Sequence, residues 1–512
     1  MPLRRLPRPT ELLAAFAAGV LLVAAFAPLA WYPLAPLALA VLYLLGLHQP
    51  GTRAAAAIGF AFGLGCFLGG VSWVYVSLSV FGGMVAWLAA LSTLVFCMVL
   101  ALFPALAVAV FARLSTAGLR VPLFSAAWVL GEWLRGTLFT GFPWLAVGYS
   151  QGGDSPLAGL APLFGTYGVS FVTALIAACL GEAVWRWRSG YCPASGHPRW
   201  AYAAVPLLIA ALLGAGGAVL GILEWTHPAG RPVRVALLQG NIAQDMKWRP
   251  ESFQTSLRTY DALFDAHPAD LTVLPETALP AFWEALPPAF VESLREQARA
   301  RGGDVLIGAV AGTGERYTNS VFSVGTAPTQ RYDKVHLVPF GEFVPPGFAT
   351  LMRQLSIPMS GFSAGRADQP PLRVGGTTVA VNICYEDVFG DALRPGARAA
   401  AILVNVSNTA WFGRSLAQPQ HLQIARMRAR ETGRPMLRAT NTGMTAIVEP
   451  DGRVSAVLEP FVRGALVADV QGRTGETPYL RWGDRPVLIA SLLLLAVALI
   501  VGRARRLGRA AD

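Results

Sequence analysis

The sequence predicts a polytopic α-helical membrane domain that carries an α/β domain. Composition is the first indication, because 54% of the 512 residues are hydrophobic and only 14% are charged, which is too apolar for a soluble protein of several domains. The apolar residues are also unevenly spread: they fill residues 1–227 and return after Pro486. We therefore expect an N-terminal membrane domain over 1–227, an α/β domain over 228–484, and a C-terminal membrane helix with a basic tail over 485–512.

Eight apolar segments are candidates for membrane-spanning helices, seven before the α/β domain and one after it. A helix needs about 20 apolar residues to cross the hydrocarbon core of a bilayer. The second, fifth and last segments are short by this measure. The eight segments are Glu11–Pro28, Leu34–Leu47, Ala54–Ser77, Met84–Ala112, Leu123–Leu138, Thr166–Trp185, Ala201–Leu223 and Pro486–Val501.

The placement of the arginines predicts how these segments are oriented. The connections around Ala30, Ser79 and Gln151 carry no Lys or Arg, whereas the alternate ends are arginine-rich. By the positive-inside rule, both termini are cytoplasmic and the α/β domain lies on the outer face of the membrane. Much of the net charge of +11 lies in these loops, so we expect no nucleic-acid partner. The arginines are Arg4, Arg5, Arg8, Arg53, Arg113, Arg120, Arg186, Arg188, Arg199, Arg503, Arg505, Arg506 and Arg509.

The first segment has a second interpretation, as a cleaved signal peptide from Arg4 to about Ala30. It has a basic start, an apolar core and the small residues Ala25 and Ala27. Its removal leaves the remaining arginine alternation unchanged and explains nothing further, so we favour the membrane helix.

One predicted span contains charge, at Glu132 and Arg135. Ionisable residues inside a span indicate function by default, but a spacing of three residues also allows a structural ion pair, and both interpretations stay open. The aromatic residues Phe142 and Trp144 that follow would suit the lipid headgroup interface.

The block between the last two spans has the pattern of an α/β domain. Short β-branched runs alternate with amphipathic segments, which favours a layered α/β fold. It contains no Gly-rich phosphate loop and no paired-His zinc motif, so we expect no cofactor and no metal. The predicted strands are Val233–Gln239, Leu271–Leu274, Val305–Gly308, Val379–Asn382, Ala401–Val406 and Thr445–Val448, and the predicted helices are Glu251–Ala266, Pro288–Ala300 and Leu416–Thr432.

Cys384 is the first candidate for chemistry. It ends the apolar run Thr377–Ile383 and is followed by acidic residues, a pattern typical of a nucleophile delivered by a strand to a sharp turn. A buried core cysteine is the alternative. It has no disulfide partner in the exported domain, where a free thiol needs either burial or a chemical reason. The other cysteines are Cys66, Cys97, Cys179 and Cys192.

Lysine usage supplies the second candidate. The chain has only two lysines, Lys247 and Lys334, and meets its other needs for positive charge with arginine. A compact ammonium can approach a small anion as a point charge, which a planar guanidinium cannot. We therefore expect a function for Lys334 and leave Lys247 between function and a surface charge.

Glu276 is the third candidate, because it ends an apolar strand in the same way as Cys384. The carboxyl ends of strands in an α/β sheet are where sites assemble. A carboxylate, an ammonium and a thiol brought together there suit covalent catalysis. Glu276 accepts the thiol proton, Lys334 stabilises the thiolate and the oxyanion, and Cys384 attacks a carbonyl to form a thioester.

The motifs around these residues resemble a known signature. They are Pro275-Glu276, the stretch Tyr332–Glu342 and the stretch Asn382–Glu386, and together they resemble the Glu-Lys-Cys signature of the nitrilase (carbon–nitrogen hydrolase) superfamily. Combined with seven helices before the domain and one after it, they resemble the apolipoprotein N-acyltransferase family over essentially the whole chain. Gln239–Ile242 with Lys247-Trp248, and Glu132–Arg135 with Gly-Phe-Pro-Trp, also match that family.

The resemblance implies an α-β-β-α sandwich and a ping-pong acyl transfer. A membrane phospholipid, typically phosphatidylethanolamine, would acylate the cysteine. The acyl chain would then pass to the α-amino group of the S-diacylglyceryl-cysteine that begins an apolipoprotein. In this family pattern Glu276 is the base, Lys334 the oxyanion stabiliser and Cys384 the nucleophile. The implied supporting residues are Glu342 and Glu386, which orient the site, Tyr385, beside the nucleophile, and Trp248, which contacts substrate.

Several apolar loop segments of the exported domain suit a lipid substrate. The segment Pro345–Phe362, together with Phe282-Trp283 and Trp411-Phe412, could enter the membrane interface and admit acyl chains, and core packing is the alternative. His421, on a predicted helix, is interpreted as a surface or structural residue.

Two other functions share parts of this pattern. A membrane-tethered amidase or nitrilase would use the same three residues but would release its acyl group to water. A transporter or receptor would use the outer domain for binding and would assign no role to the thiol.

Overall fold

The structure is a computed structural model that describes residues 6–116, 118–189, 199–244, 247, 250–313, 316–345 and 361–511. Contacts divide the chain into two compact units. The first comprises Met1–Tyr75, Trp87–Leu223 and Trp482–Asp512, and the second comprises Val76–Ala86 and Glu224–Arg481.

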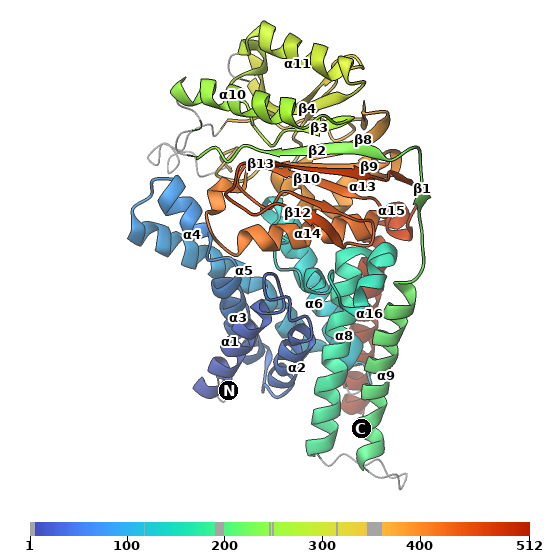
Figure 1. The fold of residues 1–512 in the computed structure, drawn as a ribbon. Coiled ribbons are helices and arrows are strands. Elements are labelled where there is room, and N and C mark those ends of the chain that lie inside the picture. The colour runs from blue at the N-terminus through green and yellow to red at the C-terminus, as the bar shows by residue number, and fades with distance from the viewer. Residues whose placement is uncertain are drawn as a thin grey trace. The chain divides into compact units, whose positions relative to one another are not determined.

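The first unit is helical (Figure 1). Each of the eight predicted spans corresponds to a helix in the described residues, so the predicted polytopic helical domain is confirmed. The helices are α1 (Pro9–Val23), α2 (Leu34–Leu47), α3 (Thr52–Gly70), α5 (Ala86–Leu114), α6 (Arg120–Thr137), α8 (Ala161–Ser189), α9 (Arg199–Leu220) and α16 (Arg485–Ala511). Shorter turns are α4 (Val74–Val76), η2 (Leu138–Thr140), α7 (Val147–Ser150) and η3 (Pro156–Leu160).

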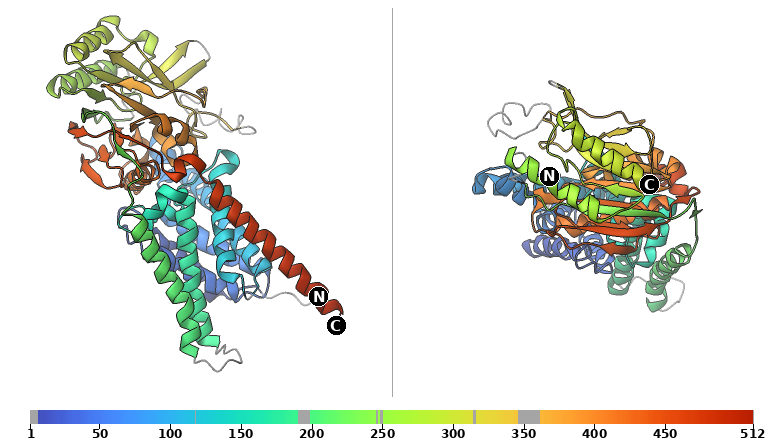
Figure 2. Two further views of the ribbon diagram at one scale, coloured as in Figure 1. Left: turned by 90° about the vertical axis from the view of Figure 1, so that its right-hand side faces the viewer. Right: turned by 45° about the horizontal axis from the view of Figure 1, so that its top comes forward.

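Length and composition distinguish these helices. Among the described residues, five helical segments are long and apolar enough to cross a membrane: α3, α5, α8 with the preceding η3, α9 and α16. Helices α1 and α2 are shorter and apolar. Figure 2 shows that the start of α1, the end of α16, the end of α8 and the start of α9 lie toward the same end of this unit.

Helices α1 and α3 pack at backbone contact through glycines. A Cβ on Gly19 would lie 1.9 Å from the Phe62 carbonyl oxygen, and one on Gly65 would lie 2.2 Å from the Phe16 carbonyl oxygen. No side chain fits at such distances, so the small residues of these spans are required by helix packing.

Glu132 and Arg135 of α6 bind the main chain of the segment that follows the helix, between residues 142 and 147. Glu132 Oε1 accepts hydrogen bonds from Trp128 Nε1 at 3.1 Å and from the Val147 main-chain N at 2.8 Å. Arg135 Nη1 donates to the carbonyl oxygens of Phe142 and Trp144 at 2.6 and 2.5 Å. Trp144 is 1% exposed, so its predicted place at the headgroup interface is wrong, because Arg135 folds this segment back into the unit.

The second unit is built on two six-stranded sheets. The first sheet has the order β13 (Gly464–Val470), β2 (Val233–Gln239), β3 (Leu271–Val273), β4 (Asp304–Thr313), β5 (Arg316–Gly325) and β6 (Arg331–Asp333). The second has the order β12 (Val454–Val457), β11 (Ala446–Val448), β10 (Met436–Thr440), β9 (Ile402–Ser407), β8 (Thr377–Ile383) and β7 (Leu372–Val374). The central strands β2, β3 and β4, and likewise β8, β9 and β10, pair in parallel.

Helices cover the outer face of each sheet. Helices α10 (Pro250–Ala266) and α11 (Pro288–Ala300) pack on the first sheet, and α13 (Gly390–Ala399) and α14 (Ala417–Thr432) pack on the second (Figure 1). A buried apolar cluster with side chains from both sheets, such as Leu237 and Val404, fills the space between them. The fold is therefore an α-β-β-α sandwich, as the resemblance implied.

Other short elements complete this unit. They are η1 (Ser77–Phe81), β1 (His227–Pro228), η4 (Trp283–Ala285), η5 (Cys384–Val388), η6 (Thr409–Phe412), β14 (Arg473–Thr474) and α15 (Pro478–Trp482). The hydrogen bond of 2.8 Å from Ser77 Oγ to the Trp411 carbonyl and the contact of the Phe81 and Trp411 rings tie η1 to η6. Part of the predicted third span therefore belongs to this unit, because its last turn packs on a loop of the sandwich.

Candidate active site

Cys384 lies at a sharp turn between strand β8 and the 3₁₀ helix η5. The strand ends at Ile383, and Cys384 itself has a φ of 54°, in the left-handed region that residues with a Cβ rarely adopt. Such strained geometry at a strand-to-helix turn is a property of nucleophile elbows, which hold a reactive atom clear of the sheet. The residue is 8% exposed.

Glu276 lies in the turn that follows β3, with its carboxylate bound from both sheets. Asn319 Nδ2, on β5, donates to Oε1 at 2.7 Å. The main-chain N–H of Asn408, after β9, donates to Oε2 at 2.7 Å. Glu276 is 7% exposed, so these donors replace the water that would otherwise solvate an ionised carboxylate.

Lys334 follows β6 and is held between two carboxylates. Its Nζ lies 2.9 Å from Glu342 and 3.6 Å from Glu276 Oε1, and its side chain is 1% exposed. Glu342 also accepts hydrogen bonds from the Val338 main-chain N at 2.8 Å and from Asn319 Nδ2 at 3.0 Å. The structure thus brings the predicted Glu276 and Lys334 together with Glu342, and Asn319 bridges the two carboxylates.

The charges of these groups fix the protonation states. Burial and the Glu276 carboxylate raise the pKa of Cys384 above its ordinary value, against the opposing charge of Lys334. Burial acts to raise the pKa of Glu276 but is outweighed by Lys334 and Asn319, which leave that pKa below its ordinary value. Burial acts to lower the pKa of Lys334, but Glu342 and Glu276 outweigh it and raise that pKa. The resting site holds a neutral thiol, an ionised carboxylate and an ammonium, which is the starting state for general-base activation.

Glu386 joins the cysteine turn to the loop that carries the lysine. Its carboxylate accepts from the main-chain N–H groups of Ile383 at 2.7 Å and Val335 at 2.7 Å. It also accepts from His336 N at 3.1 Å and from the Tyr332 hydroxyl at 3.0 Å. This carboxylate therefore fixes two backbone segments of the site, which is the arrangement that an orienting residue requires.

Tyr385, next to Cys384 in the sequence, is 8% exposed. Its ring lies 5.2 Å from that of Phe389 and 6.0 Å from that of His336, measured between ring centroids. The predicted Trp248 lies outside the described residues.

Lys247 is also buried at this site, at 2% exposure, so the surface interpretation is wrong. Its Nζ donates to the Glu276 carbonyl oxygen at 3.2 Å and to Thr277 Oγ1 at 2.7 Å. Burial lowers the pKa of Lys247 to about 8, against the charges of Glu276 and Cys384. Both lysines of the chain therefore belong to one site.

A buried polar network that sequence reasoning missed lies behind the cysteine turn. His421 Nε2 lies 2.6 Å from Asp387 Oδ1, and Arg438 Nη2 lies 2.8 Å from His421 Nδ1. Because arginine only donates, Nδ1 must accept, so Nε2 carries the proton and donates to Asp387. Burial and the Arg438 charge lower the pKa of His421, in agreement with a neutral ring.

This network reaches Cys384 through Asn405. Arg438 Nη1 donates to Asp387 Oδ2 at 3.1 Å and to Asn405 Oδ1 at 3.2 Å, and Asn405 Nδ2 donates to the Cys384 carbonyl oxygen at 3.1 Å. His421 is 1% exposed and cannot be a surface residue. The sequence feature that could have indicated this buried network is Arg438, a charged residue inside the apolar run Met436–Thr440.

Comparison with known proteins agrees with this architecture. Residues 18–179 match the family model of the apolipoprotein N-acyltransferase N-terminal domain, and residues 234–479 match that of carbon-nitrogen hydrolases. An apolipoprotein N-acyltransferase of Nitrosomonas europaea is 47% identical over 503 residues, which cover 97% of this chain and 98% of that protein. One of Ralstonia nicotianae is 46% identical over 507 residues, which cover 96% of this chain and 93% of that protein. The chain belongs to the apolipoprotein N-acyltransferase family.

Among solved structures, a mutant of an amidase of the nitrilase superfamily from Nesterenkonia aligns with a TM-score of 0.37 and 21% sequence identity. The alignment covers 50% of this chain and 95% of the amidase chain.

Two loops of the second unit carry exposed aromatic side chains, as a lipid substrate would favour. Trp411 is 36% exposed and Phe282 is 37% exposed, so both rings present apolar surface. Trp283 instead stacks on Phe322 at 4.0 Å between ring centroids, so it is a packing residue. Most of the predicted segment Pro345–Phe362 lies outside the described residues.

Proposed function

We propose that this protein transfers an acyl chain from a membrane phospholipid to the N-terminal amine of an S-diacylglyceryl-cysteine apolipoprotein, through a thioester on Cys384. The observation that carries the proposal is the buried cluster of Glu276, Lys334 and Cys384 in a chain of the apolipoprotein N-acyltransferase family. Phosphatidylethanolamine is the donor that we propose, and Trp248 is proposed to contact substrate.

In the first half-reaction Glu276 removes the thiol proton as Cys384 Sγ attacks the ester carbonyl carbon of the phospholipid. Lys334 stabilises the oxyanion that forms, with its own position fixed by Glu342. The carbon–oxygen bond to glycerol then breaks, and Glu276 returns the proton to the departing glycerol oxygen. The products are the acyl-cysteine and a lysophospholipid.

In the second half-reaction the neutral α-amine of the lipoprotein attacks the thioester carbonyl. Glu276 accepts the proton that the amine loses, and Lys334 again stabilises the oxyanion. The carbon–sulfur bond breaks, an amide forms, and Glu276 returns the proton to the Cys384 thiolate. The acyl chain has moved from oxygen to sulfur to nitrogen, and the enzyme is regenerated without a cofactor.

A hydrolase with the same three residues would pass the acyl group to water. Incubation of the purified protein with phospholipid, with and without a diacylglyceryl lipopeptide, separates the two functions. The proposal predicts one lysophospholipid per protein without the peptide and continued release with it. Continued release without any peptide would identify a hydrolase and contradict the transfer.

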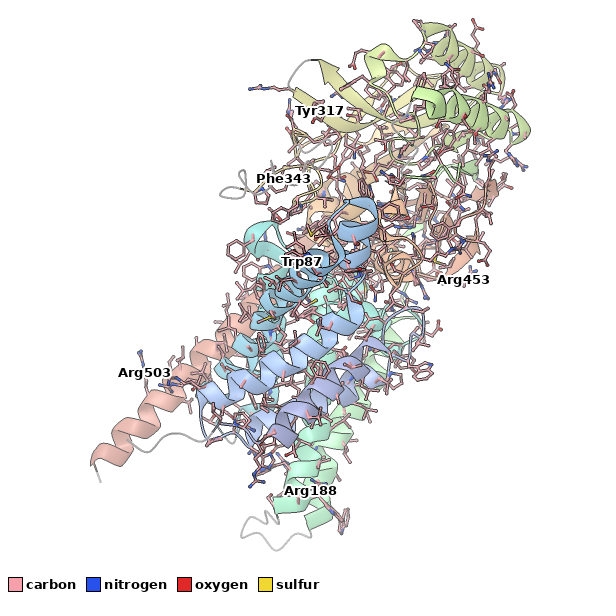
Figure 3. The ribbon with its side chains drawn as sticks, turned by 90° about the vertical axis from the view of Figure 1, so that its left-hand side faces the viewer. Trp87, Arg188, Tyr317, Phe343, Arg453 and Arg503 are labelled. Atoms are coloured by element: carbon pink, nitrogen blue, oxygen red, sulfur yellow. The ribbon has the colours of Figure 1, made fainter. Side chains whose placement is uncertain are left out.

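We further propose that the protein lies in the cytoplasmic (inner) membrane with both termini in the cytoplasm and the sandwich, over residues 228–484, outside. The alternating arginines and the common end of α1 and α16 support this orientation. Figure 3 shows Arg188 and Arg503 toward one end of the helical unit, and Arg453 belongs to the exposed turn between β11 and β12 of the sandwich.

Matched cysteine variants test this orientation. A membrane-impermeant maleimide applied to intact spheroplasts is expected to label Arg453→Cys and to spare Arg188→Cys until the membrane is opened. Labelling of Arg188→Cys but not of Arg453→Cys in intact spheroplasts would contradict the orientation. It would also contradict the proposal that the substrate binds on the outer face of the membrane.

A further inference from the structure

The two lysines of the site differ in what they bind. Lys334 contacts carboxylates, as a residue that supports an oxyanion site does, whereas Lys247 contacts the backbone and side chain of the turn that carries the base. No step of the proposed mechanism uses Lys247. Its burial at 2% exposure costs desolvation energy that a solvated lysine would not incur, so its position needs an explanation.

We propose that Lys247 is a positioning residue for the general base: it clamps the Glu276-Thr277 turn so that the Glu276 carboxylate faces the thiol. This inference deepens the proposed function and rests on it. The clamp consists of two hydrogen bonds from one ammonium, to the Glu276 carbonyl oxygen and to Thr277 Oγ1.

The turn that Lys247 binds is strained and close-packed. Thr277 has a φ of 43°, which is a rare conformation for a β-branched residue. A Cβ on Gly308 of β4 would lie 2.3 Å from the Pro275 carbonyl oxygen and 2.8 Å from the Thr277 nitrogen. The turn is therefore pressed against β4, and a strained segment of this kind persists only where its surroundings hold it.

The chemistry of the contacts explains why lysine is present. An ammonium supplies several donors from one small atom, whereas a guanidinium is larger and planar. In a chain that otherwise uses arginine, a buried position with two acceptors close together favours lysine. The ammonium also lies near the ionised Glu276 and helps to hold its pKa below the ordinary value.

Lys247→Met tests the clamp because it keeps an unbranched side chain and removes every donor. We expect the rate of thioester formation in a single turnover to fall by about ten- to a hundredfold, the scale of a misplaced catalytic group, with little change in the KM for phospholipid. Arg453→Met, on the exposed turn between β11 and β12, is the matched control and should keep the wild-type rate. A Lys247→Met rate close to wild type would overturn the inference.

Substitutions of Thr277 test whether its hydroxyl, and not only its bulk, is needed for thioester formation. Thr277→Val keeps the β-branch and loses the hydroxyl, and is expected to slow thioester formation, whereas Thr277→Ser keeps the hydroxyl and should restore the rate. The double variant Lys247→Met/Thr277→Val should be no slower than Lys247→Met alone, since the two residues form one contact. Effects that multiply would mean that the residues act independently and would overturn the clamp.

A lipid-free reaction separates this inference from the proposed function. Alkylation of Cys384 by iodoacetamide, followed by peptide mapping, reports the activation of the thiol without phospholipid or acceptor. The clamp predicts slower alkylation at neutral pH in Lys247→Met than in wild type, and equal rates would overturn it. A wild-type protein that alkylates but never forms a thioester would contradict the proposed function alone.

Discussion

The Asn408 main-chain N–H donates a hydrogen bond of 2.7 Å to Glu276 Oε2, although the two residues are 132 positions apart in the sequence. Asn408 follows strand β9 of the second sheet, and Glu276 follows strand β3 of the first. The Glu276 carboxylate is therefore held by residues of both sheets, so its position depends on how the two sheets pack.

Glu276→Gln is expected to block thioester formation. The amide cannot accept the thiol proton, and its NH₂ group cannot accept the hydrogen bonds that Asn319 and Asn408 both donate. We expect a loss of about a hundredfold or more in the single-turnover rate, the range for a general base. Glu292→Gln, on the exposed surface of α11, serves as the control. A Glu276→Gln protein that acylates at the normal rate would require another base.

Lys334→Arg is expected to reduce thioester formation about a hundredfold, the effect of losing one oxyanion donor. The charge is retained, but the larger planar group does not fit between Glu342 and Glu276, where the Nζ distances are 2.9 and 3.6 Å. Pre-steady-state measurement of acyl-cysteine formation gives the rate. Near-normal rates would show that the rarity of lysine at this position has no catalytic meaning.

His421 is expected to be required for stability and for the rate. His421→Leu leaves Asp387 and Arg438 each short of a buried partner, at about 1–3 kcal/mol per group, so the Tm should fall clearly. His421→Gln can keep the donor to Asp387 and should recover part of both the Tm and the thioester rate. His227→Leu, on an exposed strand, is the control. Equal behaviour of the Leu and Gln variants would mean that the hydrogen bonds do not matter.

The depressed pKa of Lys247 predicts a pH dependence of stability. The group has a pKa of about 8 in the folded protein against 10.5 as the ordinary value, so between these pH values the unfolded chain binds the extra proton. Stability rises with pH wherever the unfolded state binds more protons. The Tm of the wild type relative to Lys247→Met should therefore rise from pH 8 to pH 10. A constant or falling difference would contradict the burial of a lysine that titrates in this range.

The sequence predicted those parts of the molecule that short-range patterns encode. All eight helical segments follow from runs of apolar residues, and strands such as β2 and β8 follow from β-branched runs. Helix α13 was missed because Pro395 and its charged residues obscure the pattern. Strand β10 was missed because Arg438 interrupts its apolar run. The residue that pairs with Arg438, Asp387, is distant in the sequence and is brought to it only by folding.

The residues of the candidate site likewise fall into those that sequence patterns could identify and those that they could not. Glu276, Lys334 and Cys384 could be singled out as candidates because each follows a strand or carries a rare residue type. Asn319, Asn405 and His421 could not, because asparagine and histidine are common in loops and at surfaces. Their roles depend on contacts between distant segments, such as the 2.7 Å bond from Asn319 to Glu276 across 43 positions.

Intact-mass spectrometry of the purified protein incubated with phospholipid tests whether Cys384 carries the acyl chain. We expect a mass increase equal to one acyl chain on the wild type, located on Cys384 by peptide mapping and removed by hydroxylamine or by a lipopeptide amine. Cys384→Ser should fold normally and lose turnover almost entirely, since the same base cannot activate a hydroxyl of much higher pKa. An active Cys384→Ser protein, together with a wild type that never shows the adduct, would contradict the thioester mechanism.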